Sequence, residues 1–184
     1  MQSNQKQVAE LIRPTKVLIV DDEHYTRKVI RTLLALIGIT NIQDAVDGKS
    51  GLDAIAMNQP DVVLLDWEMP GIDGAEFTRR VRSPKTFPYP DVPIIMLTGH
   101  GERSRVREAV RLGVHEFLLK PVSSNALLTR IMSVLTKPRA MVKRGDFYGP
   151  EPRKLSSYKP EADGYNLSTH QVVDQQSNLM LFVP

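Results

Sequence analysis

The sequence predicts a doubly wound α/β domain, in which a five-stranded parallel sheet carries helices on both faces. Short aliphatic runs bounded by Asp, Pro or Gly recur along the chain, and such runs are typical of buried parallel strands. Between them, apolar residues recur at helical spacing. Because strand and helix alternate five times, right-handed crossovers are expected to bring the strands into one parallel sheet.

Each element is expected from its own pattern. The expected strands are residues 17–20, 41–46, 62–65, 94–97 and 117–119. The expected helices are residues 25–37, 49–57, 74–81, 103–112 and 123–135. Polar Gln43 and Asp44 indicate that the second strand lies at a sheet edge. Residues 83–93 contain four prolines and are expected to form a stiff, extended surface connection.

The chain divides into one domain and two peripheral segments. With 184 residues, 41% of them hydrophobic, it suits a single compact domain at 16–136, an N-terminal extension at 1–15 and a C-terminal extension at 137–184. The C-terminal extension is rich in Pro, Gly, Ser and charge without periodicity, so we expect it to be extended or disordered when alone. Its apolar end, LMLFVP at 179–184, should be buried against this domain or a partner.

Bulk composition excludes several classes of function. The 24 basic and 21 acidic residues nearly cancel, so charge alone does not indicate nucleic-acid binding. The absence of cysteine excludes disulfides, cysteine-based zinc sites and thiol nucleophiles, and it fits a reducing compartment. Without a signal-peptide pattern or a long apolar segment, the sequence predicts a cytoplasmic protein that does not span a membrane.

Polar residues follow four of the expected strands at their carboxyl ends. Asp21 and Asp22 follow the first strand, Asp66 the third, Thr98 the fourth and Lys120 the fifth. In an open parallel sheet this edge holds the functional crevice. Clustered carboxylates repel one another unless a divalent cation lies among them, and Mg²⁺ suits such a site because it needs few carboxylates and shares phosphate oxygens. The alternative is that each residue only ends a strand or caps a helix.

These residues lie in segments that together resemble the receiver domain of two-component response regulators. The segments are VLIVDDEHYTRKVIRTLL, PDVVLLDWEMPGIDG, PIIMLTGHG and HEFLLKPV, within residues 15 to 136. The resemblance implies a flavodoxin-like (βα)5 fold and a bacterial phosphorelay protein in which Asp66 accepts a phosphoryl group. It also implies that Asp21, Asp22, Asp66 and the backbone carbonyl of Glu68 hold Mg²⁺, and that Lys120 contacts the phosphate oxygens.

The same resemblance assigns roles around the acceptor. Thr98 would bond a phosphoryl oxygen and move together with Phe117 as a two-state switch, although Phe117 alone also fits simple core packing. Glu68 and His100 would flank the path of a hydrolytic water and modulate phosphoryl lifetime. The family commonly has a cis bond between this Lys and Pro, so we expect one at Lys120–Pro121.

The expected partner is a sensor histidine kinase or a phosphotransfer protein, and the expected output is altered protein contact through the face between the fourth and fifth helices. The chain would be a phospho-acceptor with self-catalysed transfer and autodephosphorylation rather than an enzyme. The tail lacks the paired amphipathic helices of a helix-turn-helix, so no direct DNA binding is expected.

Two alternatives remain open at this point. In the first, the tail forms a homodimer with LMLFVP as the anchor, or the fourth-helix to fifth-helix face pairs two copies. In the second, the chain is an aspartyl-phosphate phosphatase. That chemistry usually uses two aspartates separated by one residue, whereas Asp21 and Asp22 are adjacent.

Overall fold

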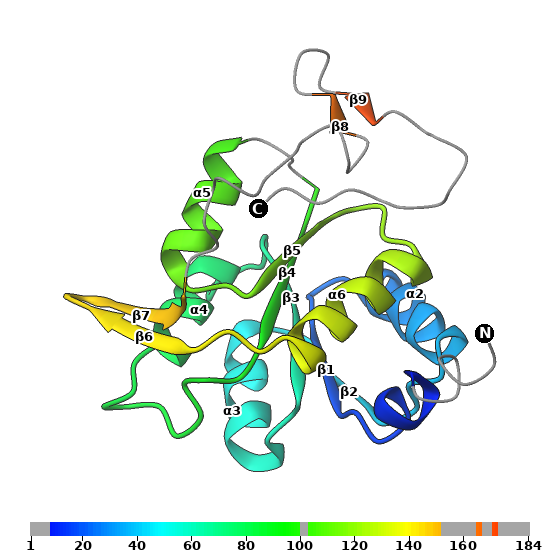
Figure 1. Cartoon of the computed structure of the whole chain (residues 1–184), viewed down its shortest axis with the longest axis horizontal. Coiled ribbons are helices and arrows are strands. Elements are labelled where there is room, and N and C mark those ends of the chain that lie inside the picture. Colours follow the sequence, from blue (N-terminus) through cyan, green and yellow to red (C-terminus); the bar gives the residue numbers. More distant parts are fainter. Residues whose placement is uncertain (1–7, 100–102, 152–164, 167–170, 173–184) are drawn as a thin grey trace.

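The computed structural model describes residues 8–99, 103–151, 165–166 and 171–172 (Figure 1). The elements in chain order are β1 (Val17–Val20), α2 (His24–Leu36), β2 (Ile42–Ala45), α3 (Gly48–Asn58), β3 (Val62–Asp66), α4 (Gly74–Val81), β4 (Ile94–Thr98), α5 (Arg103–Leu112), β5 (Glu116–Leu119), α6 (Ser124–Thr136), β6 (Met141–Arg144), β7 (Phe147–Pro150), β8 (Tyr165–Asn166) and β9 (Gln171–Val172). The five predicted strands and five predicted helices are all present, with small shifts at their ends. No helix within the described ranges is long and apolar enough to cross a bilayer.

The central sheet is parallel throughout and has the order β2-β1-β3-β4-β5. The predicted edge position of β2 is therefore confirmed. The strand order reverses beside β1, so the carboxyl ends of β1 and β3 are neighbours at the topological switch point. Ligands of open α/β sheets bind at such a point.

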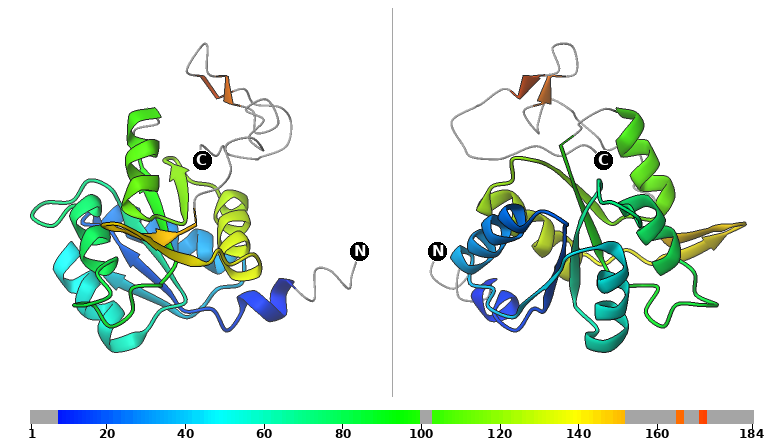
Figure 2. Two further views of the ribbon diagram at one scale, coloured as in Figure 1. Left: turned by 60° about the vertical axis from the view of Figure 1, so that its left-hand side comes forward. Right: turned by 180° about the vertical axis from the view of Figure 1, so that it is seen from behind.

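Helices cover both faces of the sheet (Figure 2). One apolar cluster joins α2 and α6 to strand residues such as Ile19, Leu64 and Leu97. The other joins α3, α4 and α5 to residues such as Leu65 and Met96. Successive strand residues point to opposite faces, and both faces are covered, which explains why the strands are aliphatic at almost every position.

Two segments outside the sheet pack against the core. Residues 8–12 form a short helical segment that buries Ile12. The loop 83–93 begins with a turn, because the backbone N–H groups of Thr86 and Phe87 both donate to the carbonyl of Ser83 at 2.9 Å. Phe87 and Tyr89 then pack on the core. The loop thus folds back onto the domain, whereas we expected an extended connection.

The expectation of no regular structure after residue 137 is wrong for residues 141–150, where β6 and β7 form an antiparallel hairpin. Its two-residue turn is Gly145-Asp146. Gly145 has φ +60°, and Asp146 is not among the positive-φ residues, which is the pattern of a type II′ turn. The short strands β8 and β9 also pair antiparallel. The predicted anchor at 179–184 lies outside the described residues.

Candidate functional site

Three aspartates meet at the carboxyl edge of the sheet. Asp21 and Asp22 follow β1, and Asp66 ends β3; a carboxylate oxygen from each lies within 4.8 Å of the other two. Asp21 is fully buried, Asp66 is buried and Asp22 is exposed, so the cluster opens to solvent on one side. The neighbouring positions of β1 and β3 in the sheet are what bring these side chains together.

Lys120 reaches the cluster from β5. Its Nζ atom lies 2.8 Å from Oδ1 of Asp66 and 2.9 Å from Oδ2 of Asp21. Because β4 separates β5 from β3, only a long side chain can make both contacts. The peptide bond between Lys120 and Pro121 is cis, as expected.

Burial and ion pairing oppose each other at this pair. Desolvation raises the pKa of Asp66 above its ordinary value, against the lowering effect of Lys120, and the nearby charge of Asp21 adds to the rise. For Lys120, desolvation lowers the pKa, but the hydrogen bonds to Asp66 and Asp21 outweigh it, so the pKa of Lys120 is raised. Lys120 is therefore a stable cation that faces two carboxylates.

Arg27 supports the acidic loop from behind. Its Nη1 atom donates to the carbonyl oxygens of Asp21 at 2.7 Å and Asp22 at 3.0 Å, and the side chain is buried. The sequence analysis missed this residue. The available signal was its place on the apolar face of α2, three and seven positions before the buried Ile30 and Leu34.

The loop after β3 brings the start of α4 against the backbone of Asp66. The N–H of Gly74 donates to the carbonyl of Trp67 at 2.9 Å. A Cβ atom at Gly74 would lie 2.6 Å from the carbonyl oxygen of Asp66, so glycine is needed for this approach. Asp73 then caps α4, because its carboxylate accepts from the N–H of Glu76 at 2.7 Å.

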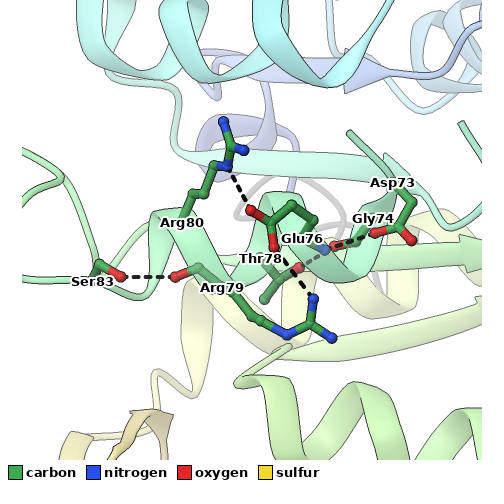
Figure 3. A network of polar contacts seen from close by, with 7 residues as sticks. All are labelled: Asp73, Gly74, Glu76, Thr78, Arg79, Arg80 and Ser83. Carbon is green, nitrogen blue, oxygen red and sulfur yellow. Dashed lines mark hydrogen bonds and ion pairs between the residues drawn. The ribbon is translucent and has the colours of Figure 1, made fainter. Parts of the chain in front are cut away.

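Polar contacts along α4 continue from this cap (Figure 3). Glu76 pairs with Arg80 at 2.8 Å and with Arg79 at 3.4 Å. The hydroxyl of Thr78 donates to the carbonyl of Gly74 at 2.7 Å. These contacts fix the first turns of α4, which also hold the loop beside Asp66.

A family comparison decides what this site belongs to: the description "Response regulator receiver domain" matches residues 17–132. The chain belongs to the response regulator receiver family. Chemotaxis protein CheY of Pseudomonas aeruginosa is 32% identical over 122 residues, which cover 66% of this chain and 97% of that protein. The probable transcriptional regulator ycf27 of Guillardia theta is 39% identical over 66% of this chain, but over only 46% of its own length.

Solved structures agree with the sequence relatives. The Vibrio cholerae chemotaxis protein CheY4 matches with a TM-score of 0.60 and 31% identity, over 66% of this chain and 98% of that one. The fold is thus the flavodoxin-like receiver fold, and the function is that of a response regulator in two-component phosphorelay signalling. The phosphatase and tail-dimer alternatives are not favoured. The hairpin at 141–150 lies beyond the family match.

The remaining predicted site residues of this receiver lie around the cluster. Thr98 ends β4 and is buried, and Leu97 before it is the register partner of Asp66. Phe117 is buried on β5 opposite Met96 and belongs to the core on the α3–α5 side. The side chain of Glu68 is exposed. His100 lies outside the described residues.

Proposed function

We propose that Asp66 is the phospho-acceptor of this receiver and that the chain itself promotes the transfer. The observation that carries the proposal is the position of Lys120, whose Nζ bridges the carboxylates of Asp66 and Asp21. A buried cation beside a partly exposed carboxylate cluster stabilises the negative charge that a transferred phosphoryl group brings.

In the transfer step, a carboxylate oxygen of Asp66 attacks the phosphorus of a phosphohistidine donor. The new O–P bond forms as the P–N bond breaks, and its electron pair returns to the imidazole nitrogen. Lys120 then exchanges a carboxylate oxygen of Asp66 for the phosphoryl oxygens. Little acid–base work is needed, because the nucleophile is ionised well below neutral pH even with a raised pKa.

The donor set fits Mg²⁺. Three carboxylates against the one contacting lysine leave an excess of negative charge, and one of the carboxylates is exposed enough to admit a hydrated cation. Asp22 and Asp66 would bind the ion directly, Asp21 through water, and Glu68 through its backbone carbonyl. Bound there, Mg²⁺ supplies positive charge to the phosphoryl oxygens.

The switch and the phosphoryl lifetime involve residues at the rim. Thr98 donates its hydroxyl to a phosphoryl oxygen, and its inward movement shifts the start of α5. Phe117 follows sterically, because it has no hydroxyl and is packed beside β4. Glu68 and His100, each two residues after a site residue, set how readily water reaches the acyl phosphate.

The phosphoryl donor is a sensor histidine kinase or a phosphotransfer protein. Apolar side chains next to the acidic loop support a protein donor. On α2, which begins two residues after Asp22, Tyr25 is 77% exposed and Val29, one turn on, is 38% exposed. Exposed apolar groups beside a reactive carboxylate offer contact area to a docking protein.

The output is a change in protein contact at the face formed by α5, β5 and α6. We assign residues 16–136 to the receiver, 1–15 to an N-terminal extension, and 137–184 to a C-terminal extension without a DNA-binding domain. Residues 141–150 of that extension form the β6–β7 hairpin beside α5. Contact with protein rather than with DNA is consistent with this arrangement.

Acetyl phosphate labelling tests the assignment directly. With Mg²⁺ present, we expect one phosphoryl group on the wild type by intact mass, lost in neutral hydroxylamine, and none on Asp66→Asn. Asp53→Asn is the matched control, since Asp53 is an exposed aspartate on α3. Retained label in Asp66→Asn, or equal loss in the control, would overturn the assignment.

A further inference from the structure

The β6–β7 hairpin is held to the domain along β7. A Cβ atom at Gly149 would lie 2.7 Å from the Cα of Gly113, and one at Gly113 would lie 2.9 Å from the carbonyl oxygen of Tyr148. Two glycines thus let the backbone of β7 touch the turn that follows α5. The hydroxyl of Tyr148 also bonds Asp91 at 2.5 Å.

The base of the hairpin is fixed as well. Arg139 donates to the carbonyl of Glu151 at 3.1 Å and to the carbonyl of His115, which precedes β5. The N–H of Glu151 donates to the carbonyl of Ala140 at 2.8 Å. The hairpin is therefore an ordered projection of the receiver, and Figure 1 shows it extending away from the domain beside α4 and α5.

The register determines which edge of the hairpin is open. The bond between Glu151 and Ala140 makes that pair a hydrogen-bonded one, and pairs alternate along an antiparallel ladder. Met141–Pro150 and Lys143–Tyr148 are therefore the non-bonded pairs, whose backbone groups point outward.

On β7, these outward groups face the domain or are missing. The carbonyl of Tyr148 faces Gly113, and Pro150 has no N–H to donate. On β6, the outward groups belong to Met141 and Lys143. No other strand in the described part of the chain pairs with this edge of β6.

Basic side chains surround the open edge. Lys143 and Arg144 are exposed, as are Arg107 and Arg111, which lie one turn apart on α5. Residues 107–112 and 137–151 hold six basic and three acidic residues, an excess that matches the formal net charge of +3 of the entire chain. The ion pair between Arg144 and Glu151, at 3.6 Å, is exposed on both sides and neutralises this region weakly.

We propose that the outer edge of β6 binds an extended acidic segment of a partner protein, which adds a third strand to the hairpin. The edge alternates N–H donors with carbonyl acceptors. A peptide backbone matches both, whereas a nucleic-acid backbone offers no donors. A second copy of this hairpin fits less well, because it would bring Lys143 and Arg144 of two chains together. The proposal does not depend on phosphorylation of Asp66.

The test uses a fluorescein-labelled peptide of alternating Glu and Val, about eight residues long to match a typical strand, with binding to the full chain followed by fluorescence anisotropy. Met141→Pro removes one outward N–H without touching a ladder bond or a charge, and Met141→Ala is its matched control. We expect about tenfold weaker binding for the proline variant, the effect of one or two lost hydrogen bonds, and wild-type binding for the alanine variant.

Charge and identity have their own measurements. The double variant Lys143→Glu, Arg144→Glu should bind the acidic peptide more weakly than wild type, and Asp66→Asn should bind it as wild type does. Circular dichroism and acetyl phosphate labelling check that each hairpin variant remains folded. Equal binding by the proline and alanine variants, tighter binding of a Lys-Val peptide, or tighter binding of a short DNA duplex at the same salt concentration would each overturn the proposal.

Discussion

The Nζ atom of Lys120 lies 2.8 Å from Oδ1 of Asp66, so a buried cation already contacts this carboxylate in the absence of phosphate. The same nitrogen lies 2.9 Å from Asp21. Removing the charge of Lys120 would leave two buried carboxylates facing each other and would remove a group that stabilises charge during transfer. Both effects act against phosphorylation.

We therefore expect Lys120→Gln to slow labelling by acetyl phosphate by about 10- to 100-fold, the usual cost of losing one charge-stabilising group. The measurement is the initial rate of phosphoryl incorporation with saturating Mg²⁺. Lys137→Gln is the control, because Lys137 is exposed at the end of α6. A wild-type rate in Lys120→Gln would exclude this role for the lysine.

Mg²⁺ binding should be visible in the fluorescence of Trp67. It is the single tryptophan of the chain, it directly follows Asp66, and it is buried. We expect Mg²⁺ to change its emission and to raise the unfolding temperature of the wild type. Asp22→Asn should weaken the apparent affinity about 10-fold or more, in line with the loss of a ligand or its support. An unchanged titration would remove Asp22 from the ligand set, and Asp53→Asn serves as the control.

His115 should make stability depend on pH. Burial, then the charges of Arg82 and Arg139, hold the pKa of His115 far below its ordinary value of 6.5. As the pH falls below about 6.5, the unfolded chain takes up a proton that the folded chain refuses. The free energy of unfolding should therefore fall, by up to about 1.4 kcal/mol per pH unit from this group, and be unaffected by it at higher pH.

Urea unfolding at several pH values checks this. His115→Asn should show a shallower dependence between about pH 4.5 and 6.5 than the wild type, whatever its overall stability. His24→Asn is the control, since His24 is exposed at the start of α2. Equal slopes for wild type and His115→Asn would show that the folded chain accommodates the proton.

Gly149→Ala should destabilise the chain by about 1–3 kcal/mol, because the added methyl would overlap the backbone of Gly113. Gly99→Ala is the comparison, since a Cβ there meets nothing within 4 Å. It should change the free energy of unfolding by about 0.5 kcal/mol or less. If the two variants unfold alike, the contact between β7 and the turn after α5 contributes nothing to stability.

The central fold could be predicted because its signals are local. Each strand is an aliphatic run of a length typical of strands, and each helix repeats its apolar residues. The meeting of Asp21, Asp66 and Lys120 could also be predicted, since parallel strands place their carboxyl ends at one edge. Only the strand order, which sequence alone does not contain, decides which pairs touch.

The hairpin and Arg27 escaped prediction for different reasons. Gly145-Asp146 between two short runs is a recognisable hairpin signal, but exposed Lys143 and Arg144 break the apolar alternation, and the anchoring contacts come from distant residues. Arg27 looks like an ordinary solvent-facing residue of an amphipathic helix. Its partners are backbone carbonyls, which carry no mark in a sequence.

The contact of Gly149 with Gly113 also determines how α5 is free to move. It restrains α5 at its carboxyl end, while the amino end follows Thr98 at the opposite edge of the sheet. A displacement that starts at Thr98 would then swing α5 about a pivot near Gly113 instead of sliding it along β5. The largest travel would fall at the amino end of the helix, and the hairpin would stay almost still.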